Sequence, residues 1–342
     1  MGSARSGTEL VRGMLNRHRD VHLAAETHYF DDLRPRLGAR AVAALEGEGR
    51  TRAIDYFRAL RHRAYGLAGN ADDGDWTREM LDHAARAIGT GGDAIFEAYC
   101  RLTALRSNKL VWGEKTPRHV FRGREILATY PDAHVVVMLR DVRGVVASYR
   151  DWRNRWYDRK AIPADLAEAV AAEERRTAAS YSLTLIALLW CSAARTAVRL
   201  HKEFGPERVT LLRFEDVLCD PEEAARLLCC RTGLPFDQVM LDASVVNSSY
   251  VTTHARTGFD ATAGERWRER LSMAERRHLD LVAGPILTRL GYPRERLGIS
   301  IAHSGSEFVK CAVAVARALF RNRTRMANPG RYVLVRLIGL TR

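Results

Sequence analysis

The sequence predicts a three-layer α/β fold, in which helices cover both faces of a parallel β-sheet. Short strand-like runs alternate along the chain with segments of helical periodicity. Residues 134–139 are mostly β-branched and apolar, as is typical of a central strand covered on both faces. A loop with glycines at positions 2 and 7 leads directly into the first predicted helix, and backbone N–H groups at such a helix start favour an anion.

The elements follow in order along the chain. Strands are predicted at residues 21–26, 110–115, 134–139 and 208–214. Apolar residues on one helical face predict the first helix over residues 8–18. The same periodicity predicts helical regions at residues 40–68, 76–106, 164–204, 220–232 and 273–290. Asp75 is predicted to cap the helix that starts near residue 76.

Basic residues outnumber acidic residues by 54 to 41, which gives a formal net charge of +13. Residues 301–342 contain eight Lys or Arg and one acidic residue, Glu307, a net charge of +7. We therefore predict a domain over residues 1–300 and a basic extension over residues 301–342. Basic residues do not gather with aromatic residues within the domain, so no nucleic acid is expected as a partner.

The extension has an apolar helical face formed by Phe308, Val309, Ala312, Val313, Ala316, Leu319 and Phe320. Two arrangements fit this face. Either the helix packs it on the domain, or the helix lies peripherally on an anionic membrane or against a lipid-linked acceptor. The sequence gives no indication of the oligomeric state.

The six cysteines contain no CxxC pair, so neither a zinc site nor another metal site is expected. Such thiols are typical of a reducing compartment, and we expect a cytoplasmic protein, with the membrane contact described above as the exception. Cys229 and Cys230 lie in an apolar stretch and are predicted to be core residues. The uncharged run at residues 177–194 is interrupted by Ser and Thr, which favours a buried helix over a membrane span.

The segment Gly2-Ser3-Ala4-Arg5-Ser6-Gly7-Thr8 has the GxxxxG spacing of a phosphate-binding loop. It differs from an ATP- or GTP-binding loop, because Thr8 stands in the lysine position and Glu9 in the position of the magnesium-binding hydroxyl. A small-molecule kinase is therefore a weak alternative. Arg5 supplies the positive charge of this loop instead.

Polar residues stand at the ends of the four predicted strands: Glu26, Lys115, Arg140 and Glu215. Ligands of open parallel sheets bind beyond the carboxyl ends of the strands. We therefore expect these side chains and the glycine loop to line one crevice.

In these segments the chain resembles sulfotransferases that use 3'-phosphoadenosine 5'-phosphosulfate (PAPS). Residues 4–8 resemble the loop that binds the 5'-phosphosulfate, and residues 139–148 resemble the motif that binds the 3'-phosphate. Further matching segments, in the same order, are residues 113–117 (GEKTP), 214–216 (FED), 247–249 (NSS) and 266–267 (RW). The likeness covers about residues 2–290 and implies a sheet of the P-loop type.

The resemblance implies a role for each matching residue, with PAPS as the donor, adenosine 3',5'-bisphosphate as the product and no metal. The 5'-phosphosulfate would be held by Arg5, Ser6, Gly7 and Thr8. The 3'-phosphate would be held by Arg140 and Ser148. Arg266 and either Ser248 or Ser249 would close over the nucleotide. Lys115 and Arg5 would stabilise charge in the transition state.

Glu26 is the predicted general base, because residues 23–28 resemble the tyrosylprotein branch of the family, where a glutamate takes the acceptor proton. His28 is the alternative, since it lies two residues further along an extended stretch and therefore faces the same side. His119 is expected to be a surface helix residue.

The chain departs from the family pattern at two places. It starts at Met1, directly before the loop, where the family has a hydrophobic strand, so either the start codon is assigned too late or this strand is absent. Glu9 replaces a hydroxyl residue beside the phosphosulfate. It either faces the ligand and repels it, or faces away and pairs with Arg12 or the helix dipole.

The predicted function is O-sulfation of a hydroxyl on a saccharide, a lipid-linked molecule or a natural product. A protein tyrosine is less expected as the acceptor. The alternative is a non-catalytic nucleotide-binding or scaffold protein of the same fold, inactivated by the missing strand and by Glu9.

Overall fold

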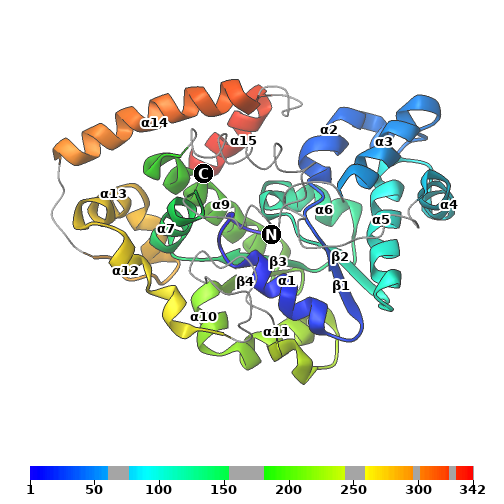
Figure 1. Ribbon diagram of the computed structural model, residues 1–342, viewed down its shortest axis with the longest axis horizontal. Helices are drawn as coiled ribbons and strands as arrows, with labels where there is room; N and C mark the ends of the chain where they lie inside the picture. Colours follow the sequence, from blue (N-terminus) through cyan, green and yellow to red (C-terminus); the bar gives the residue numbers. More distant parts are fainter. Residues whose placement is uncertain (61–76, 154–180, 243–258, 296–300, 323–328, 342) are drawn as a thin grey trace, which may run out of the picture.

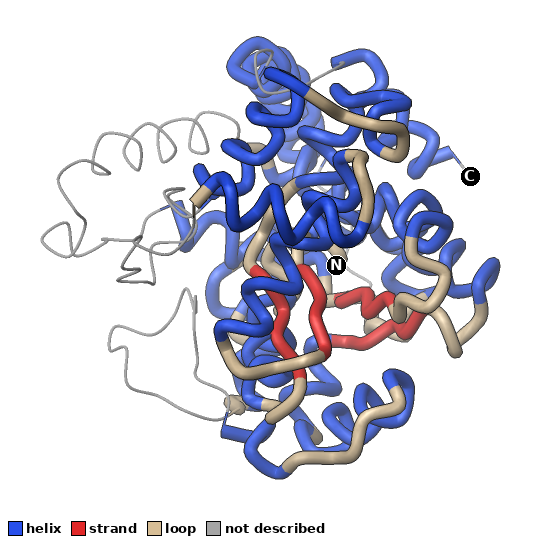
Figure 2. Tube along the Cα trace, turned by 90° about the vertical axis from the view of Figure 1, so that its right-hand side faces the viewer, coloured by secondary structure: helices blue, strands red, loops and turns tan. Residues whose placement is uncertain are grey.

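The computed structural model describes the chain except for residues 61–76, 154–180, 243–258, 296–300, 323–328 and 342. The strands lie near the centre of the molecule and helices surround them (Figures 1 and 2). The predicted α/β fold is confirmed, although the strands are short and most of the described residues are helical.

All four predicted strands are present. Strand β1 (Val21–Ala24) pairs in parallel with β2 (Val111–Glu114). Strand β3 (Val135–Leu139) pairs in parallel with β4 (Val209–Arg213). The described strands thus form two two-stranded sheets.

The first two residues of the chain connect these sheets. Gly2 forms a parallel bridge with Met138, and the Met1 carbonyl accepts a hydrogen bond from the Met138 N–H at 2.8 Å. On the other side, the Gly2 N–H donates to the carbonyl of Pro117, just beyond β2. Met1 and Gly2 therefore lie between the ends of β2 and β3, and the glycine loop follows at the carboxyl ends of the strands.

The two faces of β3 belong to different apolar clusters, as its alternating side chains require. Val135, Val137 and Leu139 pack with helices α7 (Val142–Arg153), α9 (Leu183–Phe204) and α13 (Met273–Arg289). Met138 packs on the opposite side with α1 (Thr8–Arg17), α10 (Phe214–Cys219) and α11 (Pro221–Thr232). This arrangement is the three-layer order that the run of apolar residues predicts.

A third cluster covers β1 and is built from α3 (Gly47–Ala59), α4 (Arg78–Ile88) and α5 (Gly92–Arg106). The helical region predicted at residues 76–106 is two helices, broken at residues 89–91. A Cβ atom on Gly91 would lie 2.5 Å from the Ala41 carbonyl oxygen, so the chain turns where only glycine fits. Asp75 lies outside the described residues, and Thr77 caps α4 by accepting from the Met80 N–H.

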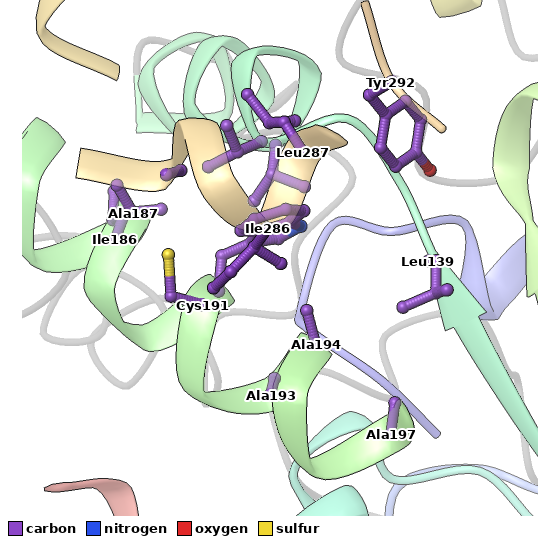
Figure 3. Packing of buried hydrophobic residues seen from close by; sticks show 14 of the residues in the cluster. Leu139, Ile186, Ala187, Cys191, Ala193, Ala194, Ala197, Ile286, Leu287 and Tyr292 are labelled. Atoms are coloured by element: carbon purple, nitrogen blue, oxygen red, sulfur yellow. The ribbon is translucent and has the colours of Figure 1, made fainter. Parts of the chain in front are cut away.

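Helix α9 is central to the packing. Figure 3 shows Ile286 of α13 on the side that faces Cys191 and Ala194 of α9. Within the described part of the chain, it is the one helix long and apolar enough, by length and composition alone, to cross a membrane. Of its most apolar stretch, 61% is buried against other elements, so α9 has the role of a core helix.

The remaining helices are α2 (Arg34–Leu37), α6 (Gly123–Thr129), α12 (Trp267–Arg270), α14 (Ile301–Asn322) and α15 (Pro329–Thr341). The last two pack on α9. Of the two adjacent cysteines predicted to be core residues, Cys229 is buried and Cys230 is exposed, because α11 turns only one of two neighbouring positions toward the core.

Candidate active site

The glycine loop has a backbone that its sequence explains. Gly7 has φ +86°, and a Cβ atom there would lie 2.4 Å from the Phe214 ring, so only glycine fits. Ser6 is fully buried, and its hydroxyl has no hydrogen-bond partner among the described residues. Because buried hydroxyls are ordinarily satisfied, this loop at the start of the ten-residue helix α1 fits an anionic group that accepts from Ser6 and the backbone N–H groups.

Three predicted ligand-binding residues meet behind this loop. The Arg5 Nε donates to the Ser148 Oγ at 3.0 Å. The Arg140 Nη1 donates to the Arg5 carbonyl at 3.0 Å. Ser148 lies on α7 and Arg140 directly follows β3, and both side chains are buried. The structure thus joins the two motifs that the resemblance assigns to the two ends of one nucleotide.

Arg140 is held by residues that the sequence analysis did not connect to it. Its guanidinium lies over the Phe214 ring, with 4.2 Å between its Cζ and the ring centroid. Its carbonyl accepts from the Trp190 indole N–H at 2.8 Å. A Cβ atom on Gly144 would lie 2.9 Å from the Arg140 Nε. Phe214 belongs to the FED segment that the resemblance matched, but no local signal marks Trp190, which lies 50 residues away in the chain.

Glu215, which follows the end of β4, accepts a hydrogen bond that holds the start of α7 in place. One carboxylate oxygen accepts from the Asp141 N–H, and the other accepts from the Tyr292 hydroxyl, each at 3.0 Å. Burial raises the pKa of Glu215 above its ordinary value. Glu215 therefore helps to position the residue beside Arg140.

Glu26 and Lys115 form the second half of the site. The Lys115 Nζ lies 2.6 Å from the Glu26 Oε1 and 3.1 Å from the Glu9 Oε2, and Lys115 is buried. Glu9 also accepts from Arg12. Burial alone would raise the pKa of Glu9, but its hydrogen bond from Arg12 and the nearby Lys115 charge lower it.

Of the two orientations considered for Glu9, the pairing with Arg12 is present. The side chain nevertheless stays beside Lys115, so it is a neighbour of the site as well. Two cations therefore face this carboxylate, which reduces its repulsion of an anion in the loop.

His28 lies between Glu26 and Arg118. The Arg118 Nη2 lies 2.9 Å from the His28 Nδ1, and the His28 Nε2 lies 3.3 Å from the Glu26 Oε2. A guanidinium can only donate, so Nδ1 accepts and the proton of the neutral imidazole is on Nε2. His28 is thereby oriented as a donor to Glu26. Sequence reasoning missed Arg118, although it directly follows the EKTP segment.

Glu114 organises the turn that carries Glu26 and His28. It accepts from the Thr27 N–H at 2.8 Å and from the Thr27 hydroxyl at 2.9 Å, and also from the Thr116 hydroxyl. His119, expected on the surface, is buried, with its Nδ1 3.1 Å from Glu114. Burial would raise the pKa of Glu114, but His119 and these donors lower it to about 2.

Glu114→Gln is expected to flatten the pH dependence of stability in acid. The folded-state pKa of Glu114 is about 2, below its ordinary 4.5, so the unfolded chain binds more protons between these values. The stabilisation is present above pH 4.5 and is lost as the pH falls toward 2. Urea unfolding across this range measures the slope of the unfolding free energy against pH. In the variant this slope should be smaller by up to about 1.4 kcal/mol per pH unit. Glu48→Gln, at an exposed ion pair with Arg52, should keep the slope, and an unchanged slope in Glu114→Gln would contradict the assignment.

The late segment is described only in part. Ser248 and Ser249 lie outside the described residues. Arg266 pairs with Asp260, and the Ala263 carbonyl between them lies 3.5 Å from the Arg140 Nη2. The segment that carries Arg266 therefore lies against Arg140. Among the described residues, no group of three His, Cys, Asp or Glu side chains is placed to hold a metal ion.

Two comparisons relate the chain to known proteins. A sequence profile of the sulfotransferase family matches residues 1–238. The structure is similar to the sulfotransferase domain from the curacin biosynthetic pathway, with a TM-score of 0.50 and 16% identity over 85% of this chain and 96% of that one. It is also similar to the sulfotransferase domain from the Synechococcus PCC 7002 olefin synthase, with a TM-score of 0.47 and 19% identity over 85% and 93% of the two chains. The profile spans more than half of the chain, and the first likeness shows a shared fold.

Proposed function

The chain belongs to the sulfotransferase family, and from this premise we propose that it transfers a sulfuryl group from PAPS to a hydroxyl group. The family supports sulfotransferase activity in general. The donor and the hydroxyl acceptor are the finer parts of the proposal, and they rest on the residues of the site.

The observation that carries the proposal is the contact between the loop and the end of β3. Arg5 reaches Ser148, and Arg140 reaches the carbonyl of Arg5, so one cluster of donors serves both motifs. Cations and hydroxyls of this kind bind phosphate oxygens through charge-assisted hydrogen bonds, each worth about 1.5–3 kcal/mol. We infer a ligand with anionic groups at both ends of a nucleoside, because the resemblance assigns one end to each motif.

PAPS supplies an activated sulfuryl group bound through oxygen to phosphate. In the proposed step the acceptor oxygen forms a bond to sulfur, the bond between sulfur and the bridging phosphate oxygen breaks, and adenosine 3',5'-bisphosphate leaves. The Glu26 carboxylate takes the proton of the acceptor hydroxyl. Lys115 and Arg5 stabilise the negative charge of the leaving oxygens without a metal.

Glu26 is engaged by Lys115 at Oε1 and by His28 at Oε2, but each carboxylate oxygen has a second lone pair that can accept the proton of the acceptor. His28 presents its Nε2 proton to Glu26, and its Nδ1 is engaged by Arg118, so neither nitrogen is ready to accept a proton from a substrate. The acceptor classes remain a saccharide, a lipid-linked molecule or a natural product, and a cytoplasmic location is part of this proposal.

Calorimetry of nucleotide binding tests the donor. Adenosine 3',5'-bisphosphate is expected to bind at least ~10-fold more tightly than ATP, because the loop lacks the lysine and hydroxyl that ATP-binding loops use. Mass spectrometry of hydroxyl acceptors incubated with PAPS then tests transfer. Equal binding of ATP would contradict the donor, and binding of the bisphosphate with no transfer to any acceptor class would favour a non-catalytic binding protein.

A further inference from the structure

Helix α14 packs on the protein through a face that is not its apolar one. The residues it buries recur at helical spacing and are small or polar: Ser304, Glu307, Cys311 and Ala314. The Thr184 hydroxyl of α9 donates to the Glu307 carbonyl at 3.2 Å. Most of the apolar face that the sequence predicts is therefore not used for this packing, and the exception is Phe308, whose ring centroid lies 5.1 Å from that of the buried His278.

Most of the large apolar side chains of α14 are exposed. Val309 and Phe320 are each 67% exposed, and Ile301 is 85% exposed. At 100° per residue, the outward residues lie within an arc of about 140° around the helix. We call this the C-terminal apolar surface, and it consists of Ile301, Phe308, Val309, Val313 and Phe320. Exposed apolar surfaces of this kind mark sites of interaction.

Helix α15 repeats the pattern. Its inner face is anchored, because the Arg336 guanidinium lies 4.7 Å from the centroid of the Phe121 ring and the Arg336 carbonyl accepts from the Ser192 hydroxyl. Leu334, Leu337 and Ile338 are exposed and recur at positions i, i+3 and i+4. Figure 1 shows both helices at the upper side of the molecule, with α14 along its edge.

The charge of this region indicates what covers the surface. Lys310 and Arg317 are exposed and lie seven residues apart, so they share one border of the apolar arc. Residues 301–342 carry a net charge of +7, and their one carboxylate, Glu307, is paired with Lys310. A second copy of the chain would bring two such charges together, which opposes self-association through this surface. An anionic lipid headgroup layer complements it.

We propose that the C-terminal apolar surface binds the interface of an anionic lipid bilayer, with α14 lying in the plane of the headgroups. Its apolar side chains enter the boundary of the acyl region, and Arg317 contacts lipid phosphates. The packed inner face keeps the helix attached to the domain during binding, so the protein binds as a folded unit. The proposal stands whether or not the site transfers sulfate.

Vesicle co-sedimentation of the full chain tests this. Binding is expected to vesicles of phosphatidylcholine containing phosphatidylglycerol, with much less binding to phosphatidylcholine alone and with weakening at high salt. The double variant Val309→Glu/Val313→Glu should lower the bound fraction ~10-fold or more, because it places two charges in the apolar arc. Arg317→Glu should lower it severalfold.

The matched control is Val42→Glu/Leu110→Glu. It also exchanges two exposed apolar residues, 73% and 81% exposed, for two carboxylates, but elsewhere on the surface. It should bind vesicles nearly as the natural sequence does. Unchanged melting temperatures show that both double variants are folded.

Three outcomes would overturn the proposal. The first is no binding of the natural sequence to anionic vesicles at low salt. The second is an equal loss in both double variants. The third is a dimer in sedimentation velocity without lipid that Val309→Glu/Val313→Glu converts to a monomer, since this result assigns the surface to a second copy.

Discussion

Glu26→Gln is expected to lower turnover by ~100-fold or more while donor binding stays nearly unchanged. The amide keeps the shape of the side chain but cannot take the proton of the acceptor. In this variant Lys115 keeps its ion pair with Glu9, at 3.1 Å, so its charge stays balanced by a carboxylate. Sulfate transfer measures turnover, and calorimetry with adenosine 3',5'-bisphosphate measures donor binding.

Glu9→Gln is the matched control, since it also removes a carboxylate from Lys115. If Glu26 is the base, Glu9→Gln should change turnover by less than ~10-fold. His28→Ala should have an intermediate effect, because His28 orients Glu26 through its Nε2. A fully active Glu26→Gln together with an inactive His28→Ala would assign the base to His28 instead.

Arg140→Ala is expected to weaken the binding of adenosine 3',5'-bisphosphate by ~2–4 kcal/mol, on the order of 30- to 1,000-fold. Removing the Arg140 guanidinium would leave the 3'-phosphate buried without the cation that pairs with it. Affinity for adenosine 5'-phosphate, which lacks that group, should change far less. Calorimetry with the two nucleotides measures this difference.

Arg226→Ala serves as the comparison for this variant. Arg226 also stacks on a phenylalanine, with its Cζ 4.0 Å from the Phe236 ring centroid, but it lies on the outer face of α11. Arg226→Ala should leave the affinity for both nucleotides unchanged. Equal losses for both nucleotides in Arg140→Ala would show that the arginine supports the site in general and does not read the 3'-phosphate.

The strand segments and the places of the motifs could be predicted because they depend on local chemistry. A β-branched run such as residues 135–139 favours an extended backbone, and the end of a parallel strand places Arg140 at the ligand edge. The spacing of eight residues from Arg140 to Ser148 fits a turn from that strand into α7. These relations involve residues near one another in the sequence.

The supports of the site could not be predicted in this way. Trp190 reaches the carbonyl of Arg140 from 50 residues away, and His119 becomes a buried partner of Glu114 although its neighbours suggested a surface helix. The tautomer of His28 follows from the position of Arg118, 90 residues later in the chain. No periodicity or spacing encodes such contacts, because they depend on how the packed elements meet.

The sequence by itself determined which residues share a helix face or a strand end, and therefore the family pattern and the candidate residues of the site. The tertiary structure alone decided which of those faces are covered. In α14 the apolar positions were clear from their spacing, yet the helix buries Ser304 and Cys311 and leaves Val309 exposed. The physical reason is that periodicity follows from the geometry of one helix, whereas burial depends on the shape and hydrogen bonds of the surface that the helix meets, here the Thr184 hydroxyl of α9.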